Sequence, residues 1–509
     1  MAWYVPGGAP DGLLSRASDP PIEPAPSENA RLLRIGRIIP LSPYSGAPAV
    51  GVTMDRFDFV VIGAGAAGEA AAHAALERGK KVAVVERELF GGSCSFWACI
   101  PSKSLLHGAA EHRCGTYPWQ RASERRDYMI NRERRDWPDD SGHVHTLEEA
   151  GATLVRGEAR IGGPGAVEVR RPDGSAQHLE TAVIVIATGS QSKMPPIPGL
   201  AETGPWTNRE ATSTRELPRS LVVLGGGASG VELTSVFARF GVETALVHSH
   251  ERLLERDHAR NSQAIERILR DDGVELRLGA RATRVRPRAG DRDAHVVELS
   301  DGGVAEGHQL MVALGRSFGL DGLGLESIGV DTKTLPRDGR LRIADGVFLI
   351  GDPAGPELFT HVSHYQGSLA VGMALGEDLS PDYRAIPRAV YLEPEVASVG
   401  VDIGQARSAG ADAFELVADL ATTARGYALE AAFGHLAIVV DRPSETILGA
   451  SVVAPDASAA IHEVVLAIQA RIPIPVLAGM LHAFPSTSRA FDGLYADALK
   501  QLRGAAQPE

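Results

Sequence analysis

A glycine-rich turn between two short apolar runs constrains the fold of this chain more than any other feature. Residues 59–62 form an apolar run that ends in the sequence G-A-G-A-A-G at residues 63–68. An alanine-rich helix to about Arg78 should follow, and then a second strand over residues 82–85 that closes on Glu86. In this βαβ arrangement, glycines let backbone amides approach a pyrophosphate while the acid holds an adenosine ribose. The pattern therefore predicts a dinucleotide site made by Gly63, Gly65, Gly68 and Glu86.

A second unit of the same kind begins at residue 221. An apolar run over residues 221–224 leads into G-G-G-A-S-G at residues 225–230, followed by a predicted helix and strand. The position that corresponds to Glu86, eighteen residues after the last glycine, is His248. A histidine there, with Arg252 nearby, suits a 2′-phosphate better than the free ribose hydroxyl that an acid would bind. We therefore predict that this site favours NADP(H) over NAD(H). Its predicted residues are Gly225, Gly227, Gly230, His248 and Arg252.

Two of the three cysteines lie close together in the sequence G-G-S-C-S-F-W-A-C-I-P-S-K at residues 91–103. Cys94 and Cys99 are five positions apart, so on a regular helix they would point about 140° away from each other. That divergence is too large for a disulfide. We therefore expect irregular backbone between them and a helix that begins near Cys99, whose N-terminus would lower the thiol pKa. The stretch is interpreted as a redox-active dithiol. Zinc binding is the weaker interpretation, because four residues separate the cysteines and no second ligand pair follows.

The composition describes a globular protein of about three domains. Of its 509 residues, 44% are hydrophobic and 23% are charged, and no apolar run has the roughly eighteen residues that a membrane span needs. The net charge of −13 argues against nucleic acid or an anionic membrane surface as a partner. Three cysteines cannot form a structural disulfide framework. The paired spacing of two of them indicates redox or metal chemistry in a reducing, cytoplasmic compartment.

Two segments lack a clear periodic pattern. Residues 1–53 are rich in Pro, Gly and Ser, without the layout of a secretory signal, and are predicted to be a disordered tail before Met54. Residues 111–150 carry charges of mixed sign, which predicts a solvated helix and its connection. Cys114 lies in this second segment and is interpreted as an ordinary thiol.

Several motifs occur together in this chain. They are the cysteine stretch at residues 91–103, A-T-G-S at 187–190, A-L-G-R at 313–316, G-D at 351–352 and E-P-E-V-A-S-V-G at 393–400. From about Asp58 to Asp497 the chain resembles the flavin-dependent pyridine nucleotide–disulfide oxidoreductases, the family of dihydrolipoyl dehydrogenase, glutathione reductase and mercuric reductase.

The resemblance implies an α/β fold with two Rossmann-like dinucleotide-binding domains and a C-terminal α+β dimerisation domain. The expected boundaries are 54–200 and 331–383 for the FAD-binding domain, 201–330 for the NAD(P)-binding domain and 384–509 for the dimerisation domain. A homodimer is implied as well.

The resemblance also implies site residues. Lys103 matches a lysine beside the hydride-accepting nitrogen of the flavin, and Glu232 matches its ion-pair partner. Cys99 matches the cysteine that contacts the flavin, and Cys94 the one that faces the substrate. Gly315 would belong to the NAD(P) site. The residues expected to bind FAD are Gly63, Gly65, Gly68, Glu86, Gly92, Ser93, Lys103, Thr188, Gly189, Gly351, Asp352 and Thr360.

The C-terminal motif departs from the family pattern. Members that act on thiols usually carry H-x-H-P-T-x-x-E, whereas residues 482–489 here read H-A-F-P-S-T-S-R. Aligned on the proline, Phe484 replaces the acid–base histidine and Arg489 replaces the glutamate that orients it. Losing a general acid–base typically costs about 10²–10⁴ in rate. This puts ordinary glutathione reductase or dihydrolipoyl dehydrogenase activity in question. Mercuric reductase and the ketopropyl-coenzyme M reductase/carboxylase also lack that histidine, but the C-terminal cysteine pair of mercuric reductase is missing here.

Three functions fit these observations. The first is an FAD-dependent NAD(P)H:disulfide oxidoreductase that passes electrons through Cys94 and Cys99 to an unidentified small-molecule acceptor. The second is a flavin-based diaphorase that reduces quinones or metal ions, as a mercuric-type reductase does. The third is a flavoprotein without catalytic activity that binds a partner.

Overall fold

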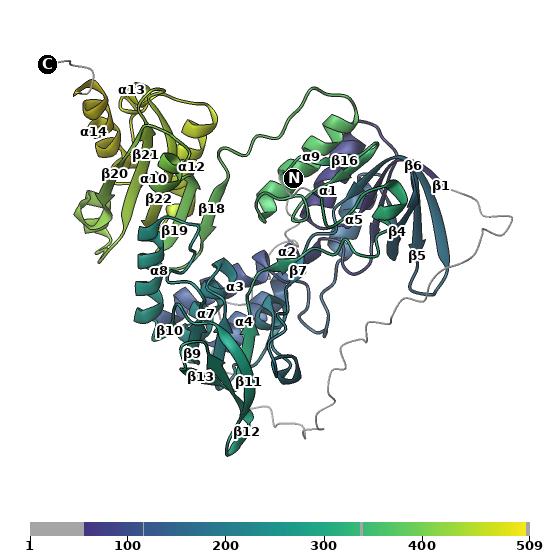
Figure 1. Cartoon of the computed structure of the whole chain (residues 1–509), viewed down its shortest axis with the longest axis horizontal. Coiled ribbons are helices and arrows are strands. Elements are labelled where there is room, and N and C mark those ends of the chain that lie inside the picture. The colour runs from purple at the N-terminus through teal and green to yellow at the C-terminus, as the bar shows by residue number, and fades with distance from the viewer. Residues whose placement is uncertain (1–54, 116, 336–338, 505–509) are drawn as a thin grey trace, which may run out of the picture. The chain divides into compact units, whose positions relative to one another are not determined.

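The computed structural model describes residues 55–115, 117–335 and 339–504 (Figure 1). The tail predicted over residues 1–53 lies outside the described residues, as does Met54. The described chain contains three principal sheets with helices packed against them. The α/β fold class predicted from the sequence is confirmed. The exact domain boundaries stay a prediction.

The first sheet has the strand order β16-β17-β6-β1-β2-β3, with β5 paired to β6 and β4 paired to β5. Strands β1, β2, β3, β6 and β17 run parallel, so their carboxyl ends lie at one edge. Helices α1 and α9 pack against each other beside this sheet. The strands are β1 (Asp55–Ile62), β2 (Val82–Glu86), β3 (Thr153–Arg156), β4 (Glu158–Gly163), β5 (Ala166–Arg170), β6 (Ala176–Ile186), β16 (Arg342–Ala344) and β17 (Val347–Leu349). The helices are α1 (Ala66–Glu77), α2 (Gly92–Phe96), α3 (Cys99–Arg113), α4 (Trp119–Met129), α5 (Ser141–Glu149) and α9 (Thr360–Ala374).

The second sheet is a four-stranded parallel sheet in the order β10-β9-β8-β14. A three-stranded antiparallel sheet, β11-β12-β13, belongs to the same part of the chain, and the short strands β7 and β15 pair with each other. The strands are β7 (Gln191–Ser192), β8 (Ser220–Leu224), β9 (Glu243–Val247), β10 (Glu275–Arg277), β11 (Ala282–Arg288), β12 (Asp291–Leu299), β13 (Val304–Gly307), β14 (Gln309–Val312) and β15 (Arg316–Ser317). The helices are α6 (Asn208–Ser213), α7 (Ala228–Arg239) and α8 (Ala259–Asp271), with 3₁₀ turns η1 (Ala201–Thr203) and η2 (Leu325–Ile328).

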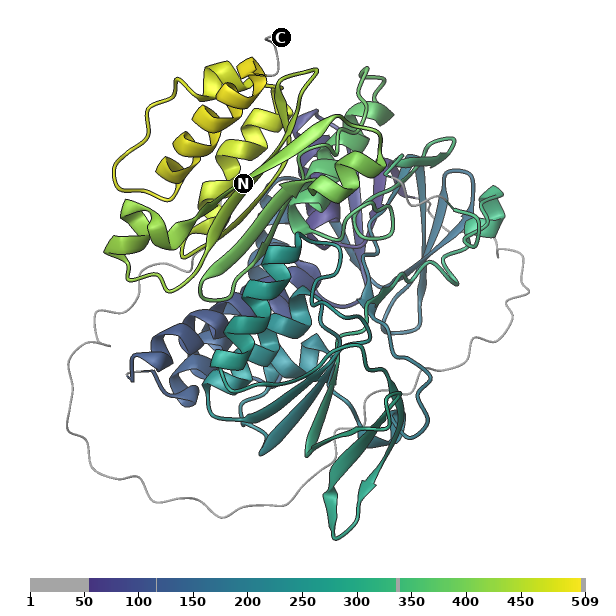
Figure 2. The same cartoon turned by 60° about the vertical axis from the view of Figure 1, so that its left-hand side comes forward.

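The third sheet is antiparallel, with the order β18-β19-β22-β21-β20 and a hydrophobic core of its own. Helices α12 and α14 pack on it, as Figure 2 shows in yellow. The strands are β18 (Pro387–Val390), β19 (Glu395–Gly400), β20 (Ala413–Asp419), β21 (His435–Asp441) and β22 (Thr446–Ala454). The helices are α10 (Ile403–Ser408), α11 (Ala424–Ala428), α12 (Ala457–Gln469), α13 (Ile474–Leu477) and α14 (Phe491–Gly504), with 3₁₀ turns η3 (Leu420–Thr422) and η4 (Ser488–Ala490).

One sequence-based expectation is wrong in part. The charged segment over residues 111–150 was expected to be solvated, but Arg126, Asp127 and Arg132 are buried. The Arg126 and Arg132 side chains both donate to Asp127 Oδ1, and Arg215 donates to its Oδ2. Arginine can be buried at acceptable cost when its fork of donors is satisfied, and here the remaining donors bind backbone carbonyls.

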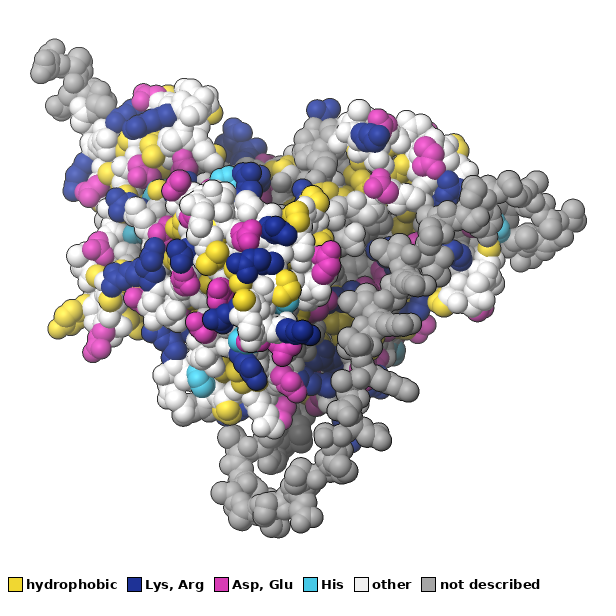
Figure 3. Space-filling view, turned by 60° about the horizontal axis from the view of Figure 1, so that its bottom comes forward, with side chains coloured by type: hydrophobic (Ala, Val, Ile, Leu, Met, Phe, Trp, Pro, Cys, Tyr) yellow, Lys and Arg dark blue, Asp and Glu magenta, His cyan; other side chains and the backbone are white. Residues whose placement is uncertain are grey.

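The surface elsewhere mixes both signs of charge. Figure 3 shows basic and acidic side chains interspersed on the face that it presents. Among the helices of the described residues, none combines the length and the apolar character needed to cross a membrane.

Candidate active site

The parallel strands of the first sheet bring together residues that are far apart in the sequence. Gly63 follows β1, Glu86 ends β2, Thr188 and Gly189 follow β6, and Gly351 follows β17. Backbone hydrogen bonds continue across this edge, from Gly63 N–H to the Val85 carbonyl and from the residue after each of β6 and β17 to the neighbouring strand. In open parallel sheets, ligands bind at the carboxyl ends of the strands. These five predicted FAD residues therefore lie at one edge of the sheet.

The first glycine turn has the tight geometry that its sequence predicts. Gly63 has φ +102°, and a Cβ there would lie 2.4 Å from the Ala187 carbonyl oxygen. A Cβ on Gly68 would lie 1.8 Å from the Gly63 oxygen, so only glycine permits this helix to start so close to the strand. Glu86 Oε2 accepts a hydrogen bond from Ala64 N–H at 2.8 Å. Burial raises the pKa of Glu86, although this bond opposes the shift.

The two cysteines lie on either side of a helix break, as the sequence predicts. Helix α2 ends at Phe96, and α3 begins at Cys99. Cys94 and Cys99 are free thiols here, half-buried, whereas Cys114 is exposed. The hydroxyl of Thr360, at the start of α9, lies 3.2 Å from Cys94 Sγ and 3.3 Å from Cys99 Sγ. One hydroxyl therefore contacts both sulfurs.

The pKa values of the two thiols are shifted in opposite directions. A hydrogen bond from Cys94, with help from Thr360 and the Lys103 charge, lowers the pKa of Cys99 to about 6. The same hydrogen bond, together with burial, raises the pKa of Cys94. At neutral pH the reduced pair is therefore a thiolate at Cys99 and a thiol at Cys94. A thiolate is the nucleophilic form of cysteine.

The substitution Thr360→Val should raise the pKa of Cys99 towards its ordinary value. A hydrogen bond to a charged group contributes about 1.5–3 kcal/mol, or roughly one to two pKa units. In the reduced wild-type protein, Cys99 should be a thiolate above about pH 6 and lose its reactivity as the pH falls through that value. The pH dependence of iodoacetamide labelling, followed by mass spectrometry of the Cys99 peptide, measures this. Thr360→Ser keeps the hydroxyl and should show the wild-type pH dependence of labelling. If Thr360→Val and the wild type gave the same labelling curve, Thr360 would not be responsible for lowering the pKa of Cys99.

Lys103 and Glu232 form an ion pair across two parts of the chain. Lys103 Nζ on α3 lies 2.8 Å from Glu232 Oε2 on α7, whose side chain is only 5% exposed. Burial lowers the pKa of Lys103, but Glu232 outweighs it and the net shift is upward, so the ammonium stays charged. Tyr391 completes this group: its N–H donates to Glu232 Oε1 at 3.0 Å, and Lys103 Nζ lies 4.8 Å from its ring centroid. The sequence pattern did not indicate Tyr391, which lies two positions before the E-P-E motif.

The residues at the first sheet edge fit FAD. The Thr188 hydroxyl is buried and has no hydrogen-bond partner within the described ranges, as expected of a group that awaits a ligand. A Cβ on Gly92 would lie 2.6 Å from the Gly65 Cα, so the backbone of the cysteine stretch lies directly against the backbone of the first glycine turn. When bound, FAD would supply the step between hydride transfer and the dithiol. Asp352, bonded to Ser190 and 3.7 Å from Arg316 Nε, lies at the same edge.

The second glycine turn repeats the first in detail. Gly225 has φ +119°, and a Cβ there would meet the Ala313 oxygen at 2.2 Å. His248 Nδ1 accepts from Gly226 N–H at 3.1 Å, which is the role that Glu86 has in the first unit. His248 is 7% exposed, and burial lowers its pKa. Gly227 and Gly230 lie at the start of α7, and Gly315 follows β14.

A carboxylate that the sequence analysis did not consider lies beside His248. Glu255 Oε2 is 3.4 Å from His248 Nε2, and its other oxygen is 3.8 Å from His250 Nε2. Arg252 donates to the Glu255 carbonyl at 2.7 Å. The predicted phosphate-binding residues are therefore close together, but a negative charge accompanies them.

The C-terminal segment holds its one histidine in a structural role. His482 Nε2 lies 3.0 Å from Glu463, Nδ1 contacts Asp492, and Arg489 pairs with Asp492 as well. Each ring nitrogen of His482 therefore faces a carboxylate of the same chain. The sequence analysis missed both carboxylates, which come from α12 and α14. Phe484 is 74% exposed in the single chain.

Family models cover most of the described chain. The model for "Pyridine nucleotide-disulphide oxidoreductase" matches residues 57–367, and the model for its dimerisation domain matches residues 386–495. The chain belongs to the pyridine nucleotide–disulfide oxidoreductase family. It is a FAD-dependent enzyme of the kind that includes dihydrolipoyl dehydrogenase.

Individual relatives agree with this assignment. The chain is 33% identical over 462 residues to dihydrolipoyl dehydrogenase from Chlorobaculum tepidum, covering 88% of this chain and 98% of that protein. It is 29% identical to mercuric reductase from Staphylococcus aureus, covering 81% and 77% of the two chains. A structure titled as a Cu(II) complex of the HOCl-induced flavoprotein disulfide reductase RclA from Escherichia coli matches with a TM-score of 0.78 and 29% identity, covering 87% and 99%.

Proposed function

We propose that this chain transfers electrons from NAD(P)H through FAD to the Cys94–Cys99 disulfide and on to a small-molecule acceptor. The observation that carries the proposal is the pair of thiols with opposed pKa shifts, which share the Thr360 hydroxyl. One hydride equivalent breaks the sulfur–sulfur bond and yields one thiol and one thiolate. At neutral pH Cys94 holds the thiol and Cys99 holds the thiolate, so no additional proton has to be supplied.

The acceptor in this proposal is a disulfide or another thiol-reactive compound. The alternative acceptor is a metal ion or a quinone, and one observation favours it: no acid–base histidine stands at position 484, and His482 is held by carboxylates. The relatives include a mercuric reductase and a reductase whose structure is titled as a Cu(II) complex. Reduction of a metal ion or a quinone does not require a leaving thiolate to be protonated.

Anaerobic NADPH should expose two additional thiols per chain, located by alkylation and mass spectrometry at Cys94 and Cys99. An acceptor panel then separates the two proposals: lipoamide, glutathione disulfide, mycothiol disulfide, Hg²⁺, Cu²⁺ and quinones. Turnover only with quinones, with no new thiols, would contradict the role of the dithiol.

We further propose that NADP(H) is favoured over NAD(H). The support is the group of His248, His250 and Arg252 beside the second glycine turn. Glu255 supports the competing preference, because a carboxylate beside His248 could accept the ribose hydroxyls of NAD(H).

The substitution Arg252→Ala should weaken binding of 2′,5′-ADP by about tenfold, because a charge-assisted hydrogen bond contributes roughly 1.5–3 kcal/mol. Binding of 5′-AMP, which lacks the 2′-phosphate, should not change. Calorimetric titration of the FAD-bound protein measures both affinities, and Arg256→Ala is the matched control on the same exposed loop. An equal loss for both ligands would show that Arg252 does not recognise the 2′-phosphate.

The assembly and compartment are proposals too. We infer a homodimer, which the family's dimerisation domain over residues 386–495 supports. A cytoplasmic location is consistent with a dithiol that must be reduced to act.

A further inference from the structure

The helix break between the two cysteines depends on one backbone carbonyl. In a continuous helix, the Trp97 carbonyl would accept from the N–H of the residue four positions later. That residue is Pro101, which has no N–H. Trp97 is 6% exposed, and a buried carbonyl without a partner costs free energy. The sequence of the dithiol stretch therefore creates an acceptor that another part of the chain has to satisfy.

Helix α6 supplies two donors to this carbonyl. Asn208 Nδ2 donates to Trp97 O at 2.7 Å. The Thr212 hydroxyl lies 3.2 Å from Trp97 O and shares its proton with the Arg209 carbonyl oxygen at 3.3 Å. Residues four apart lie on one face of a helix, so a single face of α6 makes both bonds. The Asn208 amide is oriented in turn by Ser192, whose hydroxyl donates to Asn208 Oδ1 at 2.8 Å. The Trp97 carbonyl is thus fixed from outside its own segment.

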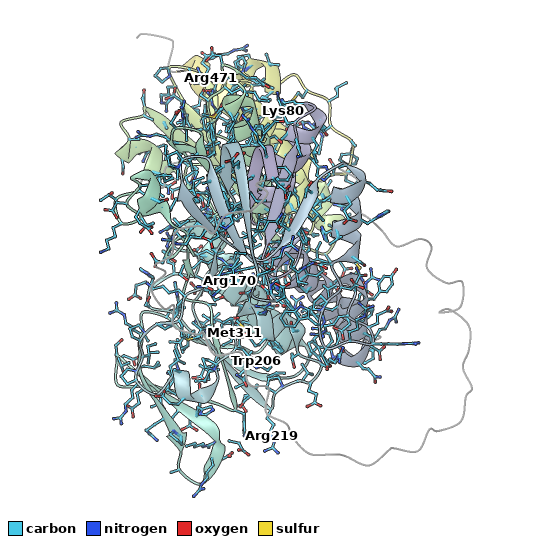
Figure 4. All side chains as sticks on the ribbon, turned by 90° about the vertical axis from the view of Figure 1, so that its right-hand side faces the viewer. Lys80, Arg170, Trp206, Arg219, Met311 and Arg471 are labelled. Carbon is cyan, nitrogen blue, oxygen red and sulfur yellow. The ribbon has the colours of Figure 1, made fainter. Side chains whose placement is uncertain are left out.

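Both ends of α6 are fixed. Before its N-terminus, Trp206 pairs with β14 beside Met311, and both residues are labelled in Figure 4. Thr207 and Glu210 form a capping box at the first turn. At its C-terminus, the buried Arg126 and Arg132 donate to the carbonyls of Thr212, Ser213 and Thr214. The buried arginine group, which the sequence analysis expected to be solvated, therefore anchors α6.

Side chains add to the same contact. The Arg209 guanidinium lies 4.2 Å from the Trp97 ring centroid and 5.1 Å from that of Trp137. The two indoles pack edge to face at 5.2 Å. Cation–π contacts of this kind contribute about 0.5–2 kcal/mol. The loop between the cysteines is therefore held through the side chain of Trp97 as well as through its backbone carbonyl.

We propose that Asn208 and Thr212 are positioning residues that set the redox potential of the Cys94–Cys99 pair. By fixing the Trp97 carbonyl they fix the angle between α2 and α3, and hence the distance between the two sulfurs. A disulfide forms only over a narrow range of separations, so a looser break lowers the effective concentration of one thiol at the other. The inference rests on the proposed function only in assuming that the pair is the working redox couple.

Equilibration of the FAD-bound protein with dithiothreitol buffers tests this proposal. In that reaction the two cysteines give two electrons and two protons to oxidised dithiothreitol, which becomes the dithiol as their disulfide forms. Alkylation and mass spectrometry measure the fraction oxidised. Asn208→Asp and Thr212→Val remove a donor with little change of shape. Each should lower the equilibrium constant for disulfide formation about tenfold, equivalent to a rise of about 30 mV in potential.

Matched variants separate positioning from general stability. Thr212→Ser keeps the hydroxyl and should retain the wild-type potential. Ser213→Ala removes a neighbouring hydroxyl that makes no hydrogen bond in the described chain, and it should change nothing. If Asn208→Asp does not fold, Asn208→Ala and Thr212→Val still decide the question. Unchanged potentials in folded Thr212→Val and Asn208→Ala would overturn the proposal, as would equal shifts in Thr212→Ser and Thr212→Val.

The experiment does not depend on NAD(P)H. If the proposed function failed, NADPH would expose no thiols, yet the dithiothreitol equilibrium would still shift with Thr212→Val. If only the positioning role failed, NADPH would reduce the pair and the equilibrium would be the same in every variant. The two failures are therefore distinguishable.

Discussion

Cys99→Ser is expected to lower kcat/KM for NADPH-driven disulfide reduction by roughly 10³-fold or more, because the Cys94–Cys99 disulfide can no longer form and loss of one member of a catalytic unit costs up to about 10⁶. Cys99 is the thiol with the lowered pKa, about 6, so it is the thiolate that remains when the disulfide opens. A serine hydroxyl at that position cannot form or break a bond to Cys94 Sγ. The loss should affect turnover of a disulfide acceptor and not the binding of NADPH. Stopped-flow assays with each acceptor, together with nucleotide binding, measure both.

A control variant is available in the same chain. Cys114→Ser removes the exposed third thiol and should leave every rate unchanged. The alternative function predicts a different outcome for Cys99→Ser: quinone reduction at the wild-type rate in Cys94→Ser, Cys99→Ser and the double variant. If the wild type also reduced no disulfide, that result would contradict the dithiol mechanism and show that the enzyme is a diaphorase.

The parts of the site that are local in the chain follow from the sequence. Each glycine turn is dictated by residues within about twenty-five positions of one another, and sterics leave little choice once a strand, a tight turn and a helix must pack. Gly63 and Gly225 accordingly both have positive φ, +102° and +119°, and each lies against an equivalent carbonyl. That the helix breaks between Cys94 and Cys99 was predictable from helix geometry and the short reach of a disulfide.

The parts that the sequence analysis missed depend on contacts between distant segments. The role of Thr360 in contacting both sulfurs depends on α9, more than 260 residues after the cysteines. Tyr391 reaches Glu232 from the C-terminal region, and no pattern in either segment indicates the pair. Arg126 was expected to be solvated because the charge pattern and hydrophobic periodicity of a segment do not reveal which other segments pack against it. In the structure it is buried. His248 was predicted as a cofactor-binding residue from its position in the sequence. Its hydrogen bond from Gly226 N–H could be recognised only in the folded turn.

Phe484→His, combined with Arg489→Glu, is expected to raise kcat/KM for lipoamide or glutathione disulfide by about 10²–10⁴, the usual contribution of a general acid–base. The alignment on Pro485 predicts that these two positions correspond to the family's histidine and glutamate. Phe484 is 74% exposed in the single chain, so an imidazole there replaces no packed core.

The two substitutions should not contribute equally. Phe484→His supplies the proton donor and should account for most of the gain. Arg489 pairs with Asp492, which also contacts His482, so Arg489→Glu alone should disturb that group and give no gain. Leu481→His places an imidazole on the same segment, at a residue that is 99% exposed, and is the matched control. Equal activity in Phe484→His, the double variant and the wild type would show that a missing proton donor does not limit this enzyme. The acceptor would then be one whose reduction needs no departing thiolate, as the metal-ion and quinone proposal requires.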